Sequence, residues 1–108
     1  ISLGVDIVDI SELQKKIDAS SLFLQKILTN RENDNFQLES IAGKIAAKEA
    51  IIKTGYIKPG EWKNIMISIN AAGAPIVLDR SGAQINKIKI TISHTTKLAV
   101  AVALYEKD

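Results

Sequence analysis

The sequence contains no cysteine, and among its 108 residues there are one histidine, one tryptophan and two prolines. Without cysteine there can be no disulfide, thiolate metal site or cysteine nucleophile, which is compatible with a reducing compartment such as the cytoplasm. A lone histidine with no cysteine argues against a zinc site. No stretch approaches the roughly 20 apolar residues that cross a bilayer, so we expect no membrane span. No cationic start precedes an apolar run and a cleavage site, so we expect no signal peptide.

What the chain does contain is typical of an ordinary folded domain, with 46% hydrophobic and 24% charged residues. This length predicts a single domain over residues 1–108. The net charge of +2 hides an asymmetry: seven acids and four bases give −3 over residues 1–40, and ten bases and five acids give +5 over residues 41–108. A lysine cluster in the second part suits an anionic ligand or an acidic partner, although a solvated helix face is more common; it comprises Lys44, Lys48, Lys53, Lys58 and Lys63.

The first half of the chain predicts one strand and several helices. Residues 3–10 alternate at period two and favour a strand. Ser11 and Gln14 have the spacing of a capping box that opens a helix, and a short helix is expected from Ser20 or Ser21 onward to residue 28. Thr29 and Glu32 repeat the capping-box pattern. The strongest helix is predicted over residues 39–54, with Gly55 as its stop.

The second half predicts mostly strands, over residues 65–69, 75–79, 87–93 and 98–105, with a hairpin connection at 94–97. A short helical turn is expected at 81–86. Because strands and helices are partly segregated, we predict an α+β fold, with a mostly antiparallel sheet packed against one long and several short helices.

Charged side chains also occur within apolar segments of the long predicted helix and of the first predicted strand. Glu49 and Lys53 share the helix arc that carries Ala42, Ala46 and Ala50, and an intrahelical ion pair worth a few tenths of a kcal/mol is the simplest explanation. Asp6 lies on the strand side opposite Val5 and Ile7, where a solvent-facing acid is ordinary. If Asp6 and Glu49 meet in the fold, their oxygen ligands favour Mg²⁺, but periodicity alone leaves that meeting open.

Two turns carry weaker signals. His94 is flanked by Ser93, Thr95 and Thr96, which together offer donors for a phosphate, although a lone histidine is usually only a turn residue. Gly73 and Pro75 are most simply a turn before an edge strand.

Four segments, taken in order, resemble the motifs of one family. Residues 4–8 (GVDIV) resemble a G-x-D-I-V signature, and residues 42–53 (AGKIAAKEAIIK) resemble A-G-R-F-A-A-K-E-A-x-x-K. Residues 70–75 (NAAGAP) resemble N-x-x-G-x-P, and residues 92–95 (ISHT) match I-S-H-[ST]. Over essentially its whole length the sequence is similar to the holo-acyl-carrier-protein synthases, the short bacterial class of 4′-phosphopantetheinyl transferases.

The resemblance implies the 4′-phosphopantetheinyl transferase fold and an enzyme of fatty acid biosynthesis. Such enzymes transfer the phosphopantetheine arm of coenzyme A to a serine of apo acyl carrier protein and release adenosine 3′,5′-bisphosphate. By motif, Asp6 and Glu49 would ligate Mg²⁺ and act in catalysis with Lys53, which contacts the phosphates. The serine proton is expected to go to water rather than to Glu49, since a carboxylate that neutralises the ion is a poor base. The implied coenzyme A-binding set is Lys44, Lys53, Gly73, Pro75, Ser93, His94 and Thr95.

The resemblance also implies partners. A homotrimer with active sites at the subunit boundaries is expected, and the acidic carrier protein would explain the basic excess. The chain departs from the family at Glu12, near a position that is often basic, and at Lys26 and Lys44, where lysine replaces arginine and removes bidentate phosphate recognition. These departures affect carrier preference more than the reaction, and docking would shift to Lys15, Lys16 or Lys26.

Two other functions compete with the transferase. A nucleic-acid-binding module would use the basic second half, but its strands carry isoleucine and valine where single-strand binders place aromatic residues, and there are only two arginines. A non-catalytic trimer gives no reason for Asp6, Glu49, Lys53 and His94 to match one motif set. We therefore expect neither nucleic acid nor a membrane among the partners.

Overall fold

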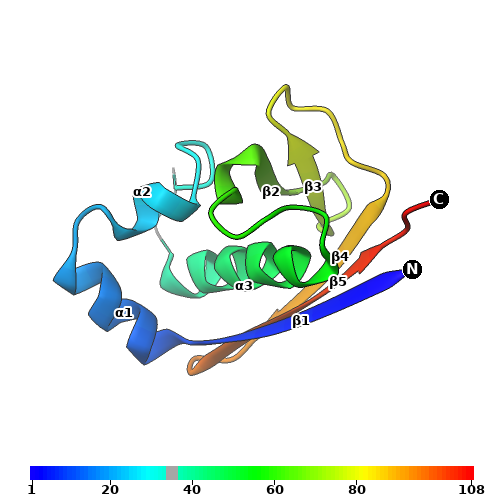
Figure 1. Ribbon diagram of the computed structural model, residues 1–108. Coiled ribbons are helices and arrows are strands. Elements are labelled where there is room, and N and C mark those ends of the chain that lie inside the picture. The colour runs from blue at the N-terminus through cyan, green and yellow to red at the C-terminus, as the bar shows by residue number, and fades with distance from the viewer. Residues whose placement is uncertain (34–36) are drawn as a thin grey trace.

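The centre of the computed structural model, which describes residues 1–33 and 37–108, is the long helix α3 (Leu38–Thr54). It lies between two antiparallel sheets (Figure 1). The larger sheet has the order β1-β5-β4, and the smaller one pairs β2 with β3. The strands are β1 (Ser2–Asp9), β2 (Ile65–Ile69), β3 (Pro75–Asp79), β4 (Ile88–His94) and β5 (Leu98–Tyr105). Helices α1 (Ile10–Ala19) and α2 (Phe23–Ile27) cover one end of α3, and a 3₁₀ turn, η1 (Trp62–Asn64), precedes β2.

This arrangement confirms the α+β prediction, and most element boundaries agree within two residues. Gly55 ends α3 in the left-handed region, at a φ of 87°, as a C-terminal glycine should. The predicted helical turn at 81–86 is wrong: Gln84 instead bridges back to Leu78 around a turn at Gly82. Among the described residues no helix has the length and apolar character needed to cross a membrane.

The predicted cap of the first helix is also wrong. Helix α1 begins at Ile10, and its N-cap is Asp9, whose carboxylate accepts hydrogen bonds from the Glu12 backbone and the Ser11 hydroxyl. These bonds hold the pKa of Asp9 below its usual value, the Glu12 backbone bond being the larger cause. The capping-box bonds between Thr29 and Glu32 do form, but they close a turn rather than a helix.

Strand β1 lies directly on α3 because both surfaces carry small residues. Ala42, Ala46 and Ala50 are fully buried. A Cβ atom at Gly4 would lie 2.0 Å from the Ala50 carbonyl oxygen, so only glycine allows this approach. The close contact brings the following residue on the same face of the strand, Asp6, to the side of the helix.

The face of the large sheet that points away from α3 is apolar and exposed, which a monomer would not favour. The alternating apolar residues of β1 point away from α3 and are exposed: Leu3 by 66%, Val5 by 53% and Ile7 by 63%. Val5 pairs with Val102, which is also exposed, so the apolar surface continues onto β5. We call this surface the outer sheet face; it consists of Leu3, Val5, Ile7, Leu98 and Val102.

Candidate active site

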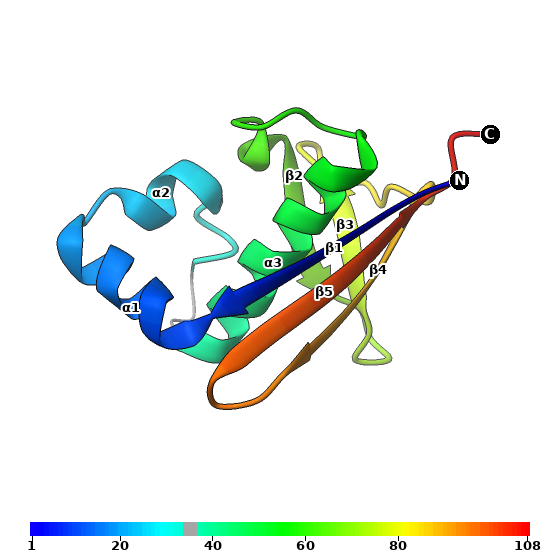
Figure 2. The same cartoon turned by 60° about the horizontal axis from the view of Figure 1, so that its bottom comes forward.

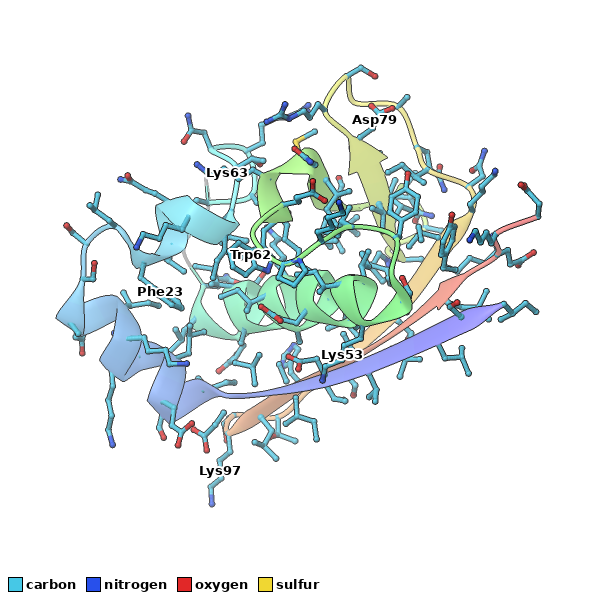
Figure 3. All side chains as sticks on the ribbon, viewed as in Figure 1. Phe23, Lys53, Trp62, Lys63, Asp79 and Lys97 are labelled. Carbon is cyan, nitrogen blue, oxygen red and sulfur yellow. The ribbon has the colours of Figure 1, made fainter. Side chains whose placement is uncertain are left out.

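Asp6 faces the helix and forms an ion pair there. Its Oδ1 lies 3.1 Å from the Lys53 Nζ, which also donates to the Val5 carbonyl at 2.9 Å. The Asp6 side chain is 19% exposed and that of Lys53 54% exposed. Figure 3 shows Lys53 in the space between α3 and β1. The simplest explanation from sequence, an intrahelical pair of Lys53 with Glu49, is therefore wrong: the lysine joins helix to strand.

Glu49 is partly buried one turn earlier on α3, and its Oε1 accepts a hydrogen bond of 3.1 Å from the indole nitrogen of Trp62. Trp62 lies above the helix in Figure 3, on the side away from the large sheet. Glu49 and Asp6 both line one cavity of about 360 Å³, together with Trp62, Phe23 and residues of α1. The structure thus brings together the two carboxylates whose meeting the sequence left open.

The donor set of this cavity fits a hard cation. Asp6 and Glu49 offer oxygen ligands only; the cavity is also lined by Glu12 and by Asp9, whose carboxylate caps α1. Within residues 1–33 and 37–108 no group of three or more His, Cys, Asp or Glu side chains is arranged to hold a metal. Two carboxylates are too few for a site made by protein alone. They are appropriate for Mg²⁺, which usually keeps several waters and takes substrate phosphates as further ligands.

A second cavity, of about 400 Å³, contains most of the remaining predicted site residues. It is lined by Lys44 of α3, Gly73 of the β2–β3 turn, Pro75 at the start of β3 and His94 at the end of β4. The turn is held by the Asn70 side chain, which accepts backbone hydrogen bonds at 2.9 and 3.0 Å, and Gly73 takes a φ of 85°. Among the residues that the structure describes, none lines both this cavity and the cavity of Asp6 and Glu49.

Ser93 and Thr95 do not line the second cavity. Ser93 alternates with Ile92 and His94 along β4, so its side chain lies on the side of the large sheet away from α3, where it pairs with Val100 of β5. The Thr95 hydroxyl oxygen accepts hydrogen bonds of 3.1 Å from the backbones of Lys97 and Leu98, closing the hairpin turn.

Sequence reasoning missed a buried ion pair beneath the site. Lys48 is fully buried. Its ammonium donates to the Glu32 carboxylate, and it also donates to the backbone carbonyls of Ile27 and Trp62 at 2.8 Å each. Burial lowers the pKa of Lys48, and the charge of Glu32 opposes that shift. The signal was present, since Lys48 follows the buried Ile41 and Ile45 at helical spacing. From the sequence, Lys48 was placed in a lysine cluster that suits an anionic ligand, an acidic partner or a solvated helix face, and none of these predicts a buried ion pair.

The sequence comparisons name one family. The chain is 37% identical to the holo-[acyl-carrier-protein] synthase of Thermoanaerobacter sp. (strain X514), over 94% of this chain and 84% of that protein. It is 36% identical to that of Clostridium perfringens (strain 13 / Type A), covering 100% and 95% of the two chains. The chain belongs to the holo-[acyl-carrier-protein] synthase family. A search of protein-family profiles finds no match.

Solved structures of holo-[acyl-carrier-protein] synthases agree with this assignment. The Helicobacter pylori enzyme in complex with coenzyme A has a TM-score of 0.82 and 26% identity, covering 96% of this chain and 99% of that one. The Bacillus anthracis enzyme, in complex with CoA (3′,5′-ADP), has a TM-score of 0.81 and 26% identity, covering 100% and 97%. The family resemblance and the fold expected from the motifs are confirmed.

Proposed function

We propose that the protein transfers the 4′-phosphopantetheine group of coenzyme A to a serine of apo acyl carrier protein and releases adenosine 3′,5′-bisphosphate. The observation that carries this proposal is the near-full-length match to holo-[acyl-carrier-protein] synthases, with structures of such enzymes bound to coenzyme A. Asp6 and Glu49 line one cavity, which is the candidate location for the transfer reaction. Fatty acid biosynthesis as the pathway and the cytoplasm as the location stay predictions.

Asp6 and Glu49 are proposed to hold Mg²⁺. When bound, the ion would supply charge neutralisation at the pyrophosphate of coenzyme A. Lys53 is half-exposed and already lies against Asp6, so its amino group can turn to a phosphate as a point charge. The cavity walls, including Trp62 and Phe23, limit the water around the reacting atoms.

The carrier protein is proposed to dock at α1 and α2. Lys16 lines the same cavity as the two carboxylates, and Lys15 and Lys26 are exposed on the adjoining helices. A carrier held by these lysines through its acidic surface would present its serine at the cavity mouth. Glu12 also lines the cavity and would oppose docking of the most acidic carriers.

We also propose that the active enzyme is a homotrimer and that each subunit is one domain over residues 1–108. The single domain is supported by α3, which packs against strands of both sheets. The trimer is supported by two features: the exposed outer sheet face and the separation of the two cavities within one chain. In a closed ring, Asp6, Glu49 and Lys53 of one subunit would face the coenzyme A-binding residues of the next. These are Lys44, Gly73, Pro75, Ser93, His94 and Thr95.

The trimer is tested by placing a charge on the outer sheet face. Val102→Asp should convert an assembly of three 11.7-kDa chains into single chains and abolish transfer, because each site would lose half of its residues. Light scattering after size-exclusion chromatography measures the mass. Lys58→Asp, in an exposed loop, is the control and should leave the trimer unchanged. A Val102→Asp variant that keeps the wild-type mass would contradict the proposed interface.

The transfer itself is tested by mass spectrometry. Purified protein, incubated with magnesium chloride, coenzyme A and an apo carrier, should add one phosphopantetheine group to the carrier serine. Parallel titrations with coenzyme A and with single-stranded RNA separate the transferase from a nucleic-acid-binding module. Absence of the mass increase with several bacterial carriers would overturn the proposed function.

A further inference from the structure

Trp62, the only tryptophan of the chain, forms a hydrogen bond to one carboxylate oxygen of Glu49, a proposed metal ligand. Its indole N–H donates to Glu49 Oε1 at 3.1 Å, and the ring lines the cavity that Glu49 shares with Asp6. An indole N–H can only donate a hydrogen bond, so in this contact Glu49 Oε1 is the acceptor. The bond also fixes the otherwise rotatable end of the glutamate side chain.

The tryptophan is itself fixed from the other side. The buried ammonium of Lys48 donates to the Trp62 carbonyl oxygen at 2.8 Å, while the same nitrogen bonds to Glu32 and to the Ile27 carbonyl. Lys48 and Glu49 are adjacent on α3, so the helix holds Trp62 at its backbone through one residue and at its indole through the next. A fully buried ion pair thus anchors the backbone of the residue whose indole N–H contacts Glu49.

We propose that Trp62 is a positioning residue for the magnesium site: its indole N–H orients Glu49 by occupying Oε1 and leaves Oε2 for the ion. This inference rests on the proposed role of Glu49 as a magnesium ligand. Groups that hydrogen-bond to metal-binding side chains fix their orientation, and removing one typically costs 10–100-fold in metal affinity. The buried Lys48–Glu32 pair contributes by keeping the tryptophan in place.

Trp62→Phe tests the proposal because it keeps an aromatic ring in the cavity and removes the donor. The half-saturating concentration of Mg²⁺ for transfer should rise about ten-fold, and excess Mg²⁺ should restore kcat. The KM for the carrier and the thermal midpoint should stay near the wild-type values. If Trp62 served packing alone, the variant would lose kcat or stability at every Mg²⁺ concentration, with unchanged half-saturation, and the proposal would be overturned.

A second measurement does not depend on turnover. In ¹⁵N-labelled protein the single tryptophan gives one indole N–H resonance, which should shift in Glu49→Gln. Glu39→Gln, an exposed glutamate in the first turn of the same helix, is the matched control and should leave the resonance unchanged. An unshifted resonance in Glu49→Gln would overturn the contact.

Titration with magnesium chloride, after saturation with coenzyme A, separates this inference from the proposed function. The indole resonance should move with Mg²⁺ in the wild-type protein and stay still in Glu49→Gln. If it does not move in the wild-type protein, the positioning role is wrong. If it moves while no carrier gains mass, the positioning role stands and the transferase proposal fails.

Discussion

Glu49→Gln should lower kcat/KM for phosphopantetheine transfer by about a hundred- to a thousand-fold. Glutamine is close in shape, and its amide oxygen can still accept the Trp62 hydrogen bond, so the fold is expected to remain. What is lost is one of two negative charges that would hold Mg²⁺. Charge stabilisation by a bound ion is worth several kcal/mol, and each 1.36 kcal/mol is a factor of ten in rate.

Asp6→Asn should have an effect of similar size for the same reason. Lys53 loses its ion pair in this variant but keeps its hydrogen bond to the Val5 carbonyl. Because that lysine is half-exposed, the pair contributes little to stability. Steady-state rates of carrier modification, measured over a range of Mg²⁺ concentrations, check both variants. Glu106→Gln, an exposed glutamate that lines neither cavity, serves as control. Wild-type rates in either variant would refute the two-carboxylate site.

The sequence was sufficient to predict the secondary structure where local chemistry decides it. The long helix was predictable because residues 39–54 are rich in alanine, isoleucine, lysine and glutamate, and Gly55 supplies the stop. The strands of the second half were predictable from their alternation and the turns between them. The N-cap of α1 was not predictable from local sequence, since Asp9 and Ser11 are both residue types that cap helices well. Which of the two is used depends on where strand β1 ends.

The site depended on tertiary packing, which no local pattern describes. Strand periodicity showed that Asp6 lies opposite Val5 and Ile7 but could not show which side meets the helix. The apolar side would be the usual choice, whereas the structure turns it outward. The deciding feature is Gly4, whose missing side chain allows β1 to approach Ala50 and so places Asp6 beside Lys53. Family motifs named Asp6 and Glu49 without explaining why they meet.

The buried ion pair was not predictable because its partners come from segments that are far apart in the sequence. In the turned view of Figure 2, α2 and the segment before β2 lie on the same side of α3. Lys48 takes its acceptors from three parts of the chain, at Ile27, Glu32 and Trp62. The Glu32 carboxylate in turn accepts from the backbones of Thr29 and Ile67. A pair with this many partners is fully hydrogen-bonded, which is the condition under which a buried ion pair is tolerated.

Lys48→Met should therefore destabilise the protein by about 3–5 kcal/mol, because the Glu32 carboxylate would be left buried without its counter-charge. Adding Glu32→Gln to this variant should recover part of the loss, since the remaining side chain is neutral and can still accept a backbone hydrogen bond.

Lys53→Met removes the half-exposed pair to Asp6 and, as matched control, should cost less than about 1 kcal/mol. Urea unfolding at one fixed protein concentration measures all three, because assembly makes apparent stability depend on concentration. A Lys48→Met variant as stable as Lys53→Met would show that the buried pair is not what joins α3 to the segments around the site.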